Sequence, residues 1–136
     1  MSVGLQVAGS YREVGAAIFF HAFFSTVSAH LEPAGWGSRF PSLMHRLFQG
    51  QLPAAEAAAA KAELATVHEE LGGLPPTAIV WDLDDRSKRP PWDHDIDPGI
   101  TSLAGFFLTS EGKDLFEVLF AALDDAAQNR HDVVIQ

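Results

Sequence analysis

Aspartates are concentrated in one stretch of the sequence, WDLDDRSKRPPWDHDIDPG, which runs from Trp81 to Gly99. Its 19 residues include six aspartates, two tryptophans and three prolines. Carboxylates at this density can bind a cation, act as a nucleophile or an acid–base pair, or attract a positively charged partner. Each of these chemistries needs particular residues around the carboxylates, so the three can be tested against the sequence.

A calcium loop is the first candidate. Asp93, Asp95 and Asp97 stand at the first, third and fifth positions of such a loop. The sixth position must turn sharply and is normally Gly, and the twelfth should be a bidentate Glu. This sequence has Pro98 and Ala104 at those positions. Two required features are missing, so we predict no dedicated metal site.

A carboxylate nucleophile is the second candidate. The run IVWDLDDR places Asp82 and Asp84 directly after a hydrophobic segment. It resembles the first motif of haloacid-dehalogenase-type phosphatases, and the resemblance implies that Asp82 attacks phosphate beside a magnesium ion. Arg86, however, takes a place usually held by Thr or Val, and the residues that follow offer no βαβ series to carry the remaining motifs. A magnesium-dependent phosphohydrolase using Asp82 and Asp84 is therefore kept only as the alternative function.

The histidines give no stronger signature. The run HEELG at His68 begins like a zinc-protease helix, but Gly72 stands where the second ligand belongs. His21 and Ser25 are four residues apart on a predicted helix, and no third group accompanies them. We therefore predict a protein that is not an enzyme, with no catalytic residue and no cofactor.

Composition limits the partners. The 136 residues are predicted to form a single domain, 1–136, with 47% hydrophobic and 20% charged residues. Eighteen acidic residues against nine basic ones give a formal charge of −9, which opposes binding to nucleic acid and favours a positively charged protein. There is no cysteine, the first 15 residues do not resemble a secretion signal, and the apolar run VGAAIFFHAFF is too short to span a membrane. We predict a cytoplasmic protein with no membrane contact.

Hydrophobic periodicity predicts the elements that must position the aspartates. Strands are expected at residues 2–7, 77–81, 106–109 and 132–136, and helices at residues 16–31, 41–50, 53–72 and 111–129, the last capped by Ser110. The order β-α-α-α-β-β-α-β indicates an α+β fold in which helices pack on one face of a small sheet. The core-facing residues of the three longer helices are predicted to be Phe20, Phe23, Phe24, Val27 and Leu31; Ala57, Ala60, Leu64, Val67 and Leu71; and Phe116, Leu119, Phe120, Leu123 and Ala127.

Two interpretations of the aspartate-rich loop remain. In the first, Trp81 and Trp92 are core anchors and the aspartates are a solvated surface loop. In the second, Pro90 and Pro91 stiffen the loop so that its carboxylates and an aromatic side chain can dock a basic partner with little loss of entropy. The contact residues would then be Asp82, Asp84, Asp85, Trp92, Asp95 and Asp97. Within that set, Asp82 is expected to act with Trp81 in holding the loop against the sheet.

Several segments carry a family resemblance: FFHAFFST, WGSRFP, WDLDD followed by PPW, and DLFEVLF. In this order they resemble the immunity 70 family of bacterial polymorphic toxin systems, over roughly Val3 to the C-terminus. The resemblance implies a non-catalytic immunity protein that binds the toxin domain of a cognate secreted or contact-dependent effector and protects the producing cell. The predicted partner of the acidic loop is then that toxin domain, and an acidic inhibitor suits a basic one. A regulatory subunit without a toxin partner is the remaining hypothesis.

Overall fold

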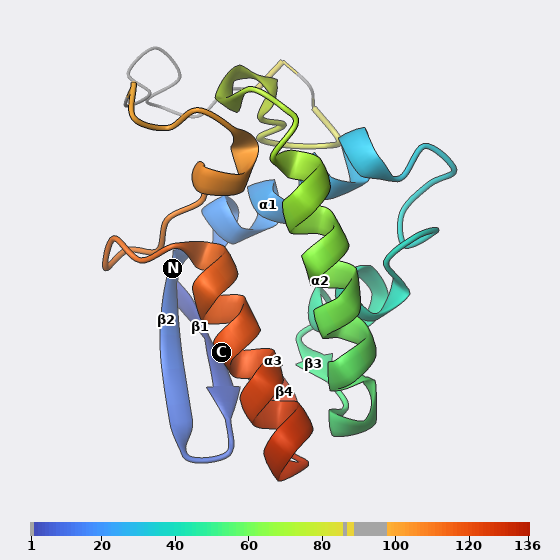
Figure 1. Ribbon diagram of the computed structural model, residues 1–136, viewed down its shortest axis with the longest axis vertical. Helices are drawn as coiled ribbons and strands as arrows, with labels where there is room; N and C mark the ends of the chain where they lie inside the picture. Colours follow the sequence, from blue (N-terminus) through green and yellow to red (C-terminus); the bar gives the residue numbers. More distant parts are fainter. Residues whose placement is uncertain (1, 86, 89–97) are drawn as a thin grey trace.

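A computed structural model describes residues 2–85, 87–88 and 98–136 of the chain (Figure 1). The strands are β1 (Ser2–Val7), β2 (Ser10–Ala16), β3 (Gln51–Leu52) and β4 (Val133–Ile135). The α-helices are α1 (Ala17–Leu31), α2 (Ala57–Leu71) and α3 (Leu115–Asn129). Short turns of π-helix at Ser42–Leu47 and of 3₁₀-helix at Ala54–Glu56, Pro76–Ala78 and Leu103–Gly105 complete the regular structure of this part of the chain.

The four strands form one antiparallel sheet in the order β2-β1-β4-β3. Strands β1 and β2 are joined by the two-residue turn Ala8–Gly9, in which Ala8 has φ 51°. A positive φ at this position is typical of the tight turns that match the twist of a hairpin. β2 and β3 are the edge strands, and the hairpin of β1 and β2 lies on the left of Figure 1.

One face of the sheet is buried under the helices. Its buried side chains are Leu5, Val7, Val14, Leu52 and Val133, which are at most 1% exposed. Alternate positions face solvent, the arrangement expected of an antiparallel sheet with one covered face. In Figure 1, α2 and α3 run side by side, and an ion pair between Lys61 and Asp124 links them at 2.5 Å.

Helix α1 occupies the centre of the core. Every residue from Ala22 to Ser28 is buried, because the helix is enclosed by other elements on most of its circumference. The Phe23 ring meets the rings of Phe24, Phe107 and Phe116 edge-on, with centroids 5.4, 5.2 and 5.5 Å apart. Edge-to-face contacts of this kind add to the stabilisation from burial itself.

The predicted α+β class, with helices packed on a small sheet, is confirmed, but the predicted order of elements is wrong in part. Residues 77–81 form no strand, and residues 106–109 contribute only an isolated bridge between Leu108 and Asp114. The two strands that the prediction missed are β2 and β3. β2 passes directly into α1 at Ala16–Ala17, and the signal that the prediction missed is Gly15, which has φ 129° one residue before the strand ends.

Two helix predictions also need correction. α3 begins at Leu115, after Asp114, whose carboxylate accepts the Phe116 N–H at 3.2 Å; Ser110 is not its cap. On the same helix Ala127 is exposed and Ala126 is buried instead. The residues from Glu111 to Asp114, predicted as a first helical turn, form a turn that ends in the isolated bridge at Asp114.

Candidate functional site

The acidic loop begins at a fixed point on helix α1. The Val80 N–H donates to the Thr26 hydroxyl oxygen at 3.1 Å, and that hydroxyl lies 2.8 Å from the Ala22 carbonyl oxygen and 3.2 Å from the Val80 carbonyl oxygen. One turn further along α1, His30 Nε2 lies 2.7 Å from the Ala78 carbonyl oxygen. These contacts hold the residues before Asp82 against the central helix α1.

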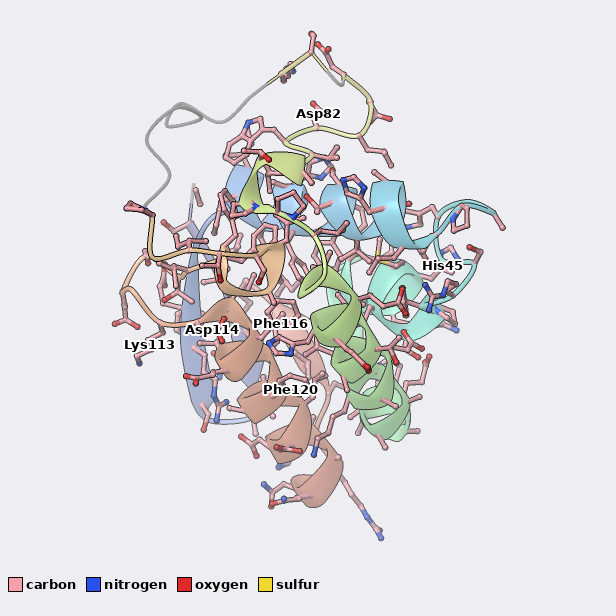
Figure 2. The ribbon with its side chains drawn as sticks, turned by 45° about the horizontal axis from the view of Figure 1, so that its top comes forward. His45, Asp82, Lys113, Asp114, Phe116 and Phe120 are labelled. Carbon is pink, nitrogen blue, oxygen red and sulfur yellow. The ribbon has the colours of Figure 1, made fainter. Side chains whose placement is uncertain are left out.

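Trp81 completes this attachment. It is 7% exposed, and its ring lies 6.3 Å from the ring of Phe19 on α1. Trp81 is therefore a core anchor, as the first interpretation of the loop predicted. The loop that follows it lies at the top of Figure 2, where Asp82 is labelled.

The described carboxylates of the loop are arranged by local turns. Asp82 accepts the Asp84 N–H at 2.9 Å and lies 3.5 Å from Lys88 Nζ. The Asp84 N–H is the main cause that lowers the pKa of Asp82, and Lys88 lowers it further. Asp85 accepts the N–H of Ser87 at 3.1 Å and also its hydroxyl, and the hydroxyl bond is the main cause that lowers the pKa of Asp85. Both groups are therefore ionised at neutral pH.

Only part of the predicted contact set falls within the described residues. Asp84 is exposed, and Asp82 and Asp85 are partly exposed. These three carboxylates lie within four residues, so the structure presents them as one charged turn. The other three predicted contacts, Trp92, Asp95 and Asp97, lie outside the described residues, as does Asp93.

The described structure does not contain the framework of strands on which a phosphohydrolase of this class places its aspartate nucleophile. An aspartate nucleophile of that class follows a buried parallel strand, whereas Asp82 follows irregular chain, and all strand pairs of this sheet are antiparallel. Across residues 2–85, 87–88 and 98–136, no group of three or more His, Asp or Glu side chains is placed to hold a metal ion.

The histidines examined in the sequence are packing residues. His21 lies against the Phe48 ring, with centroids 5.9 Å apart, and His68 against the Phe116 ring at 4.7 Å. Ser25, four residues after His21, is completely buried in α1. No helix in the described part of the chain is long and apolar enough to cross a membrane.

The WGSRFP segment is held by a buried carboxylate that the sequence did not single out. Glu32, only 3% exposed, accepts the N–H groups of Gly37, Arg39 and Phe40 at 3.0, 3.1 and 3.1 Å. The Arg39 guanidinium donates to the Leu31 carbonyl oxygen at 2.9 Å and pairs with Glu70. Nothing in the spacing of these residues revealed the role of Glu32, because its partners are backbone groups, which every residue type carries.

The described residues form a compact α+β frame with an ionised turn fixed to its central helix. Residues 5–135 match the family model of immunity protein 70, and the chain belongs to that family. Immunity proteins neutralise toxins, and those of this family act in polymorphic toxin systems, typically as non-catalytic inhibitors. No curated protein and no solved structure matches the chain.

Proposed function

We propose that this protein binds the toxin domain of a cognate polymorphic toxin in the cytoplasm of the producing cell and blocks it without catalysing a reaction. The observation that carries this proposal is the family match over residues 5–135. The described residues include neither a framework for phosphoryl transfer nor a metal-binding group. This supports a role in binding.

We assign the contact with the toxin to the acidic loop, with Asp84, Asp85, Trp92, Asp95 and Asp97 facing the partner. Asp82 belongs to the same set, but its carboxylate also closes the turn by accepting the Asp84 N–H, so it acts mainly in positioning. Hydrogen bonds hold Asp82 and Asp85 in place before any partner arrives, which reduces the entropy lost on docking.

Electrostatics favours a basic toxin surface. The chain carries a formal charge of −9, and the pKa values of Asp82 and Asp85 are lowered, so the turn keeps its full negative charge at neutral pH. A field of this sign speeds the diffusional encounter with a positive partner and loses its effect as salt is added. We therefore expect salt to slow association more than it speeds dissociation.

The test uses the toxin domain encoded beside this protein, purified in a catalytically inactive form for binding and expressed active for cell survival. The unmodified protein should bind the domain and restore growth. Asp84→Lys with Asp85→Lys should slow association by roughly tenfold or more at low salt. The matched control is Glu69→Lys, a charge reversal at an exposed residue of α2, which should leave the rate nearly unchanged.

The possible results separate the two parts of the proposal. No binding and no restored growth would refute the neutralising function. Normal growth with an unchanged association rate in the double variant would keep the function and move the contact away from the acidic turn.

A further inference from the structure

Among the residues that the structure describes, the outer edge of β2 has backbone groups without a partner. The N–H and C=O of Gly4 on β1 both bond to Gln136, at 3.0 Å each, so they point away from β2. Glu13 lies opposite Gly4 in the ladder. Because narrow and wide pairs alternate in an antiparallel ladder, the N–H and C=O of Glu13 face outward, and so do those of Tyr11 two residues earlier.

This open stretch is short and clearly bounded. Beyond Glu13, the Val14 carbonyl oxygen accepts the Ser110 N–H at 3.0 Å, and the register shifts at Val3/Gly4 on the neighbouring strand. Before Tyr11 the hairpin turns at Ala8–Gly9. An unprotected edge of a few residues is a template on which another chain can add a strand.

An exposed aromatic side chain lies on this edge. The large hydrophobic side chains that are exposed in the described part of the chain are Tyr11 at 48%, Ile18 at 57% and Leu108 at 42%. Of these, Tyr11 is on β2 itself. Together with the open backbone groups, it offers an apolar contact to a strand that pairs with this edge.

Tyr11 is also held in place. Its hydroxyl donates to the Glu13 carboxylate at 3.1 Å, and its ring lies so close to Gly4 that a Cβ there would be 2.4 Å from Cζ. A fixed, half-exposed tyrosine offers contact area at little cost in conformational entropy, as anchor residues of interfaces do.

The charges beside the edge are acidic. A depression is lined by Tyr11, Arg12, Glu13, Glu111, Lys113, Glu117, Val118 and Ala121, and Lys113 is labelled in Figure 2. The basic side chains there already have partners: Arg12 lies 3.6 Å from Asp125, and Lys113 lies 3.7 Å from Glu111. In the described structure Glu13 and Glu117 have no cationic partner.

We infer that the cognate toxin adds a β-strand carrying basic side chains to the outer edge of β2, pairing with the backbone of Tyr11 and Glu13. This inference rests on the proposed function and names the second contact of the same complex. Ring contacts run from Trp81 to Phe19 and from Phe19 to Phe107, and three residues after Phe107 the Ser110 N–H donates to Val14 of β2.

Amide hydrogen exchange tests the inference on the unmodified protein and the inactive toxin domain. In the free protein the amides of Tyr11 and Glu13 should exchange fast, while that of Arg12, which points toward β1, is protected. In the complex the Tyr11 and Glu13 amides should exchange at least tenfold more slowly, as amides paired in a ladder do.

Each of the other possible results of the hydrogen-exchange experiment leads to a different conclusion about the docking strand. A complex that leaves the Tyr11 and Glu13 amides unprotected refutes the docking strand and keeps the proposed function. Absence of any complex refutes both. Protection already present in the free protein and rising with its concentration would show that a second copy occupies the edge, and would overturn the inference.

A pair of variants separates the backbone from the side chain. Tyr11→Pro and Tyr11→Thr both lose the ring, but only proline also lacks the N–H, and proline is tolerated where that N–H faces solvent. We expect the proline variant to bind the toxin domain roughly tenfold more weakly than the threonine variant, the effect of about one net hydrogen bond. Equal affinities would overturn the inference, and unfolding curves of the two variants verify that the fold is kept.

Discussion

Removing the Glu32 carboxylate should destabilise the whole fold, although Glu32 lies outside the helices and strands. The side chain is 3% exposed and is the shared acceptor for three backbone N–H groups. In Glu32→Ala, the N–H groups of Gly37, Arg39 and Phe40 lose that acceptor in a largely buried setting.

The size of the effect follows from these contacts. A hydrogen bond to a charged group contributes about 1.5–3 kcal/mol net, so three set a ceiling of about 4.5–9 kcal/mol. In Glu32→Ala, water can enter the space left by the side chain, and a charge no longer has to be buried. These two effects reduce the expected loss of stability to roughly 3–5 kcal/mol. That is a large part of the roughly 5–15 kcal/mol that stabilises a typical domain. Glu32→Gln keeps one acceptor oxygen but turns an NH₂ group toward a donor, so about 1–3 kcal/mol is expected.

Urea unfolding of the unmodified protein, Glu32→Ala and Glu32→Gln measures these differences. They appear as shifts of the unfolding midpoint, while the dependence of the unfolding free energy on urea concentration stays the same. The matched control is Glu69→Ala, which removes the same charge from an exposed position and should change stability by less than about 0.5 kcal/mol. If Glu32→Ala and Glu69→Ala unfold at the same urea concentration, the carboxylate does not hold the loop and the reasoning fails.

Three further predictions follow from the same structure. Thr26→Val leaves the buried Val80 N–H and C=O without the hydroxyl and should cost about 1–3 kcal/mol in urea unfolding, whereas Thr26→Ser should keep the anchor. The Asp132 carboxylate accepts the Ala54 N–H, and this hydrogen bond lowers the pKa of Asp132 below 3.8. The stabilisation from this bond is present above that pH and is lost as the pH falls through the lowered pKa. In acid unfolding curves, the stability of Asp132→Asn should therefore depend less on pH than that of the unmodified protein. Gly4→Ala places a Cβ 2.6 Å from the Arg12 carbonyl oxygen and should lower stability by about 1–3 kcal/mol in thermal melts, while Gly9→Ala, with open space around it, should change little.

Helical periodicity predicted most of the core. All five residues assigned to the inward stripe of α2, from Ala57 to Leu71, are buried, because that helix presents one face to the protein and one to solvent. The same reasoning placed the buried phenylalanines of α1. Ser25 and Ser28 lie outside that predicted inward set but are also buried, because α1 is covered on most of its circumference.

The strands were harder to predict, and so was the support of the acidic loop. β3 is two residues long and carries too little pattern to be recognised, and residues 77–81 have the composition of a strand but are held by Thr26 and His30 instead of a neighbouring strand. These are contacts between residues about fifty positions apart, and local periodicity does not contain that information. The charged turn itself was predicted, because aspartate density is visible in the sequence.

The position of β4 has a consequence for biosynthesis. Strands β1 and β3 do not touch; residues 133–135 lie between them and are hydrogen-bonded on both sides. During synthesis, the hairpin of β1 and β2 and the short strand β3 must therefore wait as separate parts of the sheet until residues 133–135, which are made after both, pair with each of them.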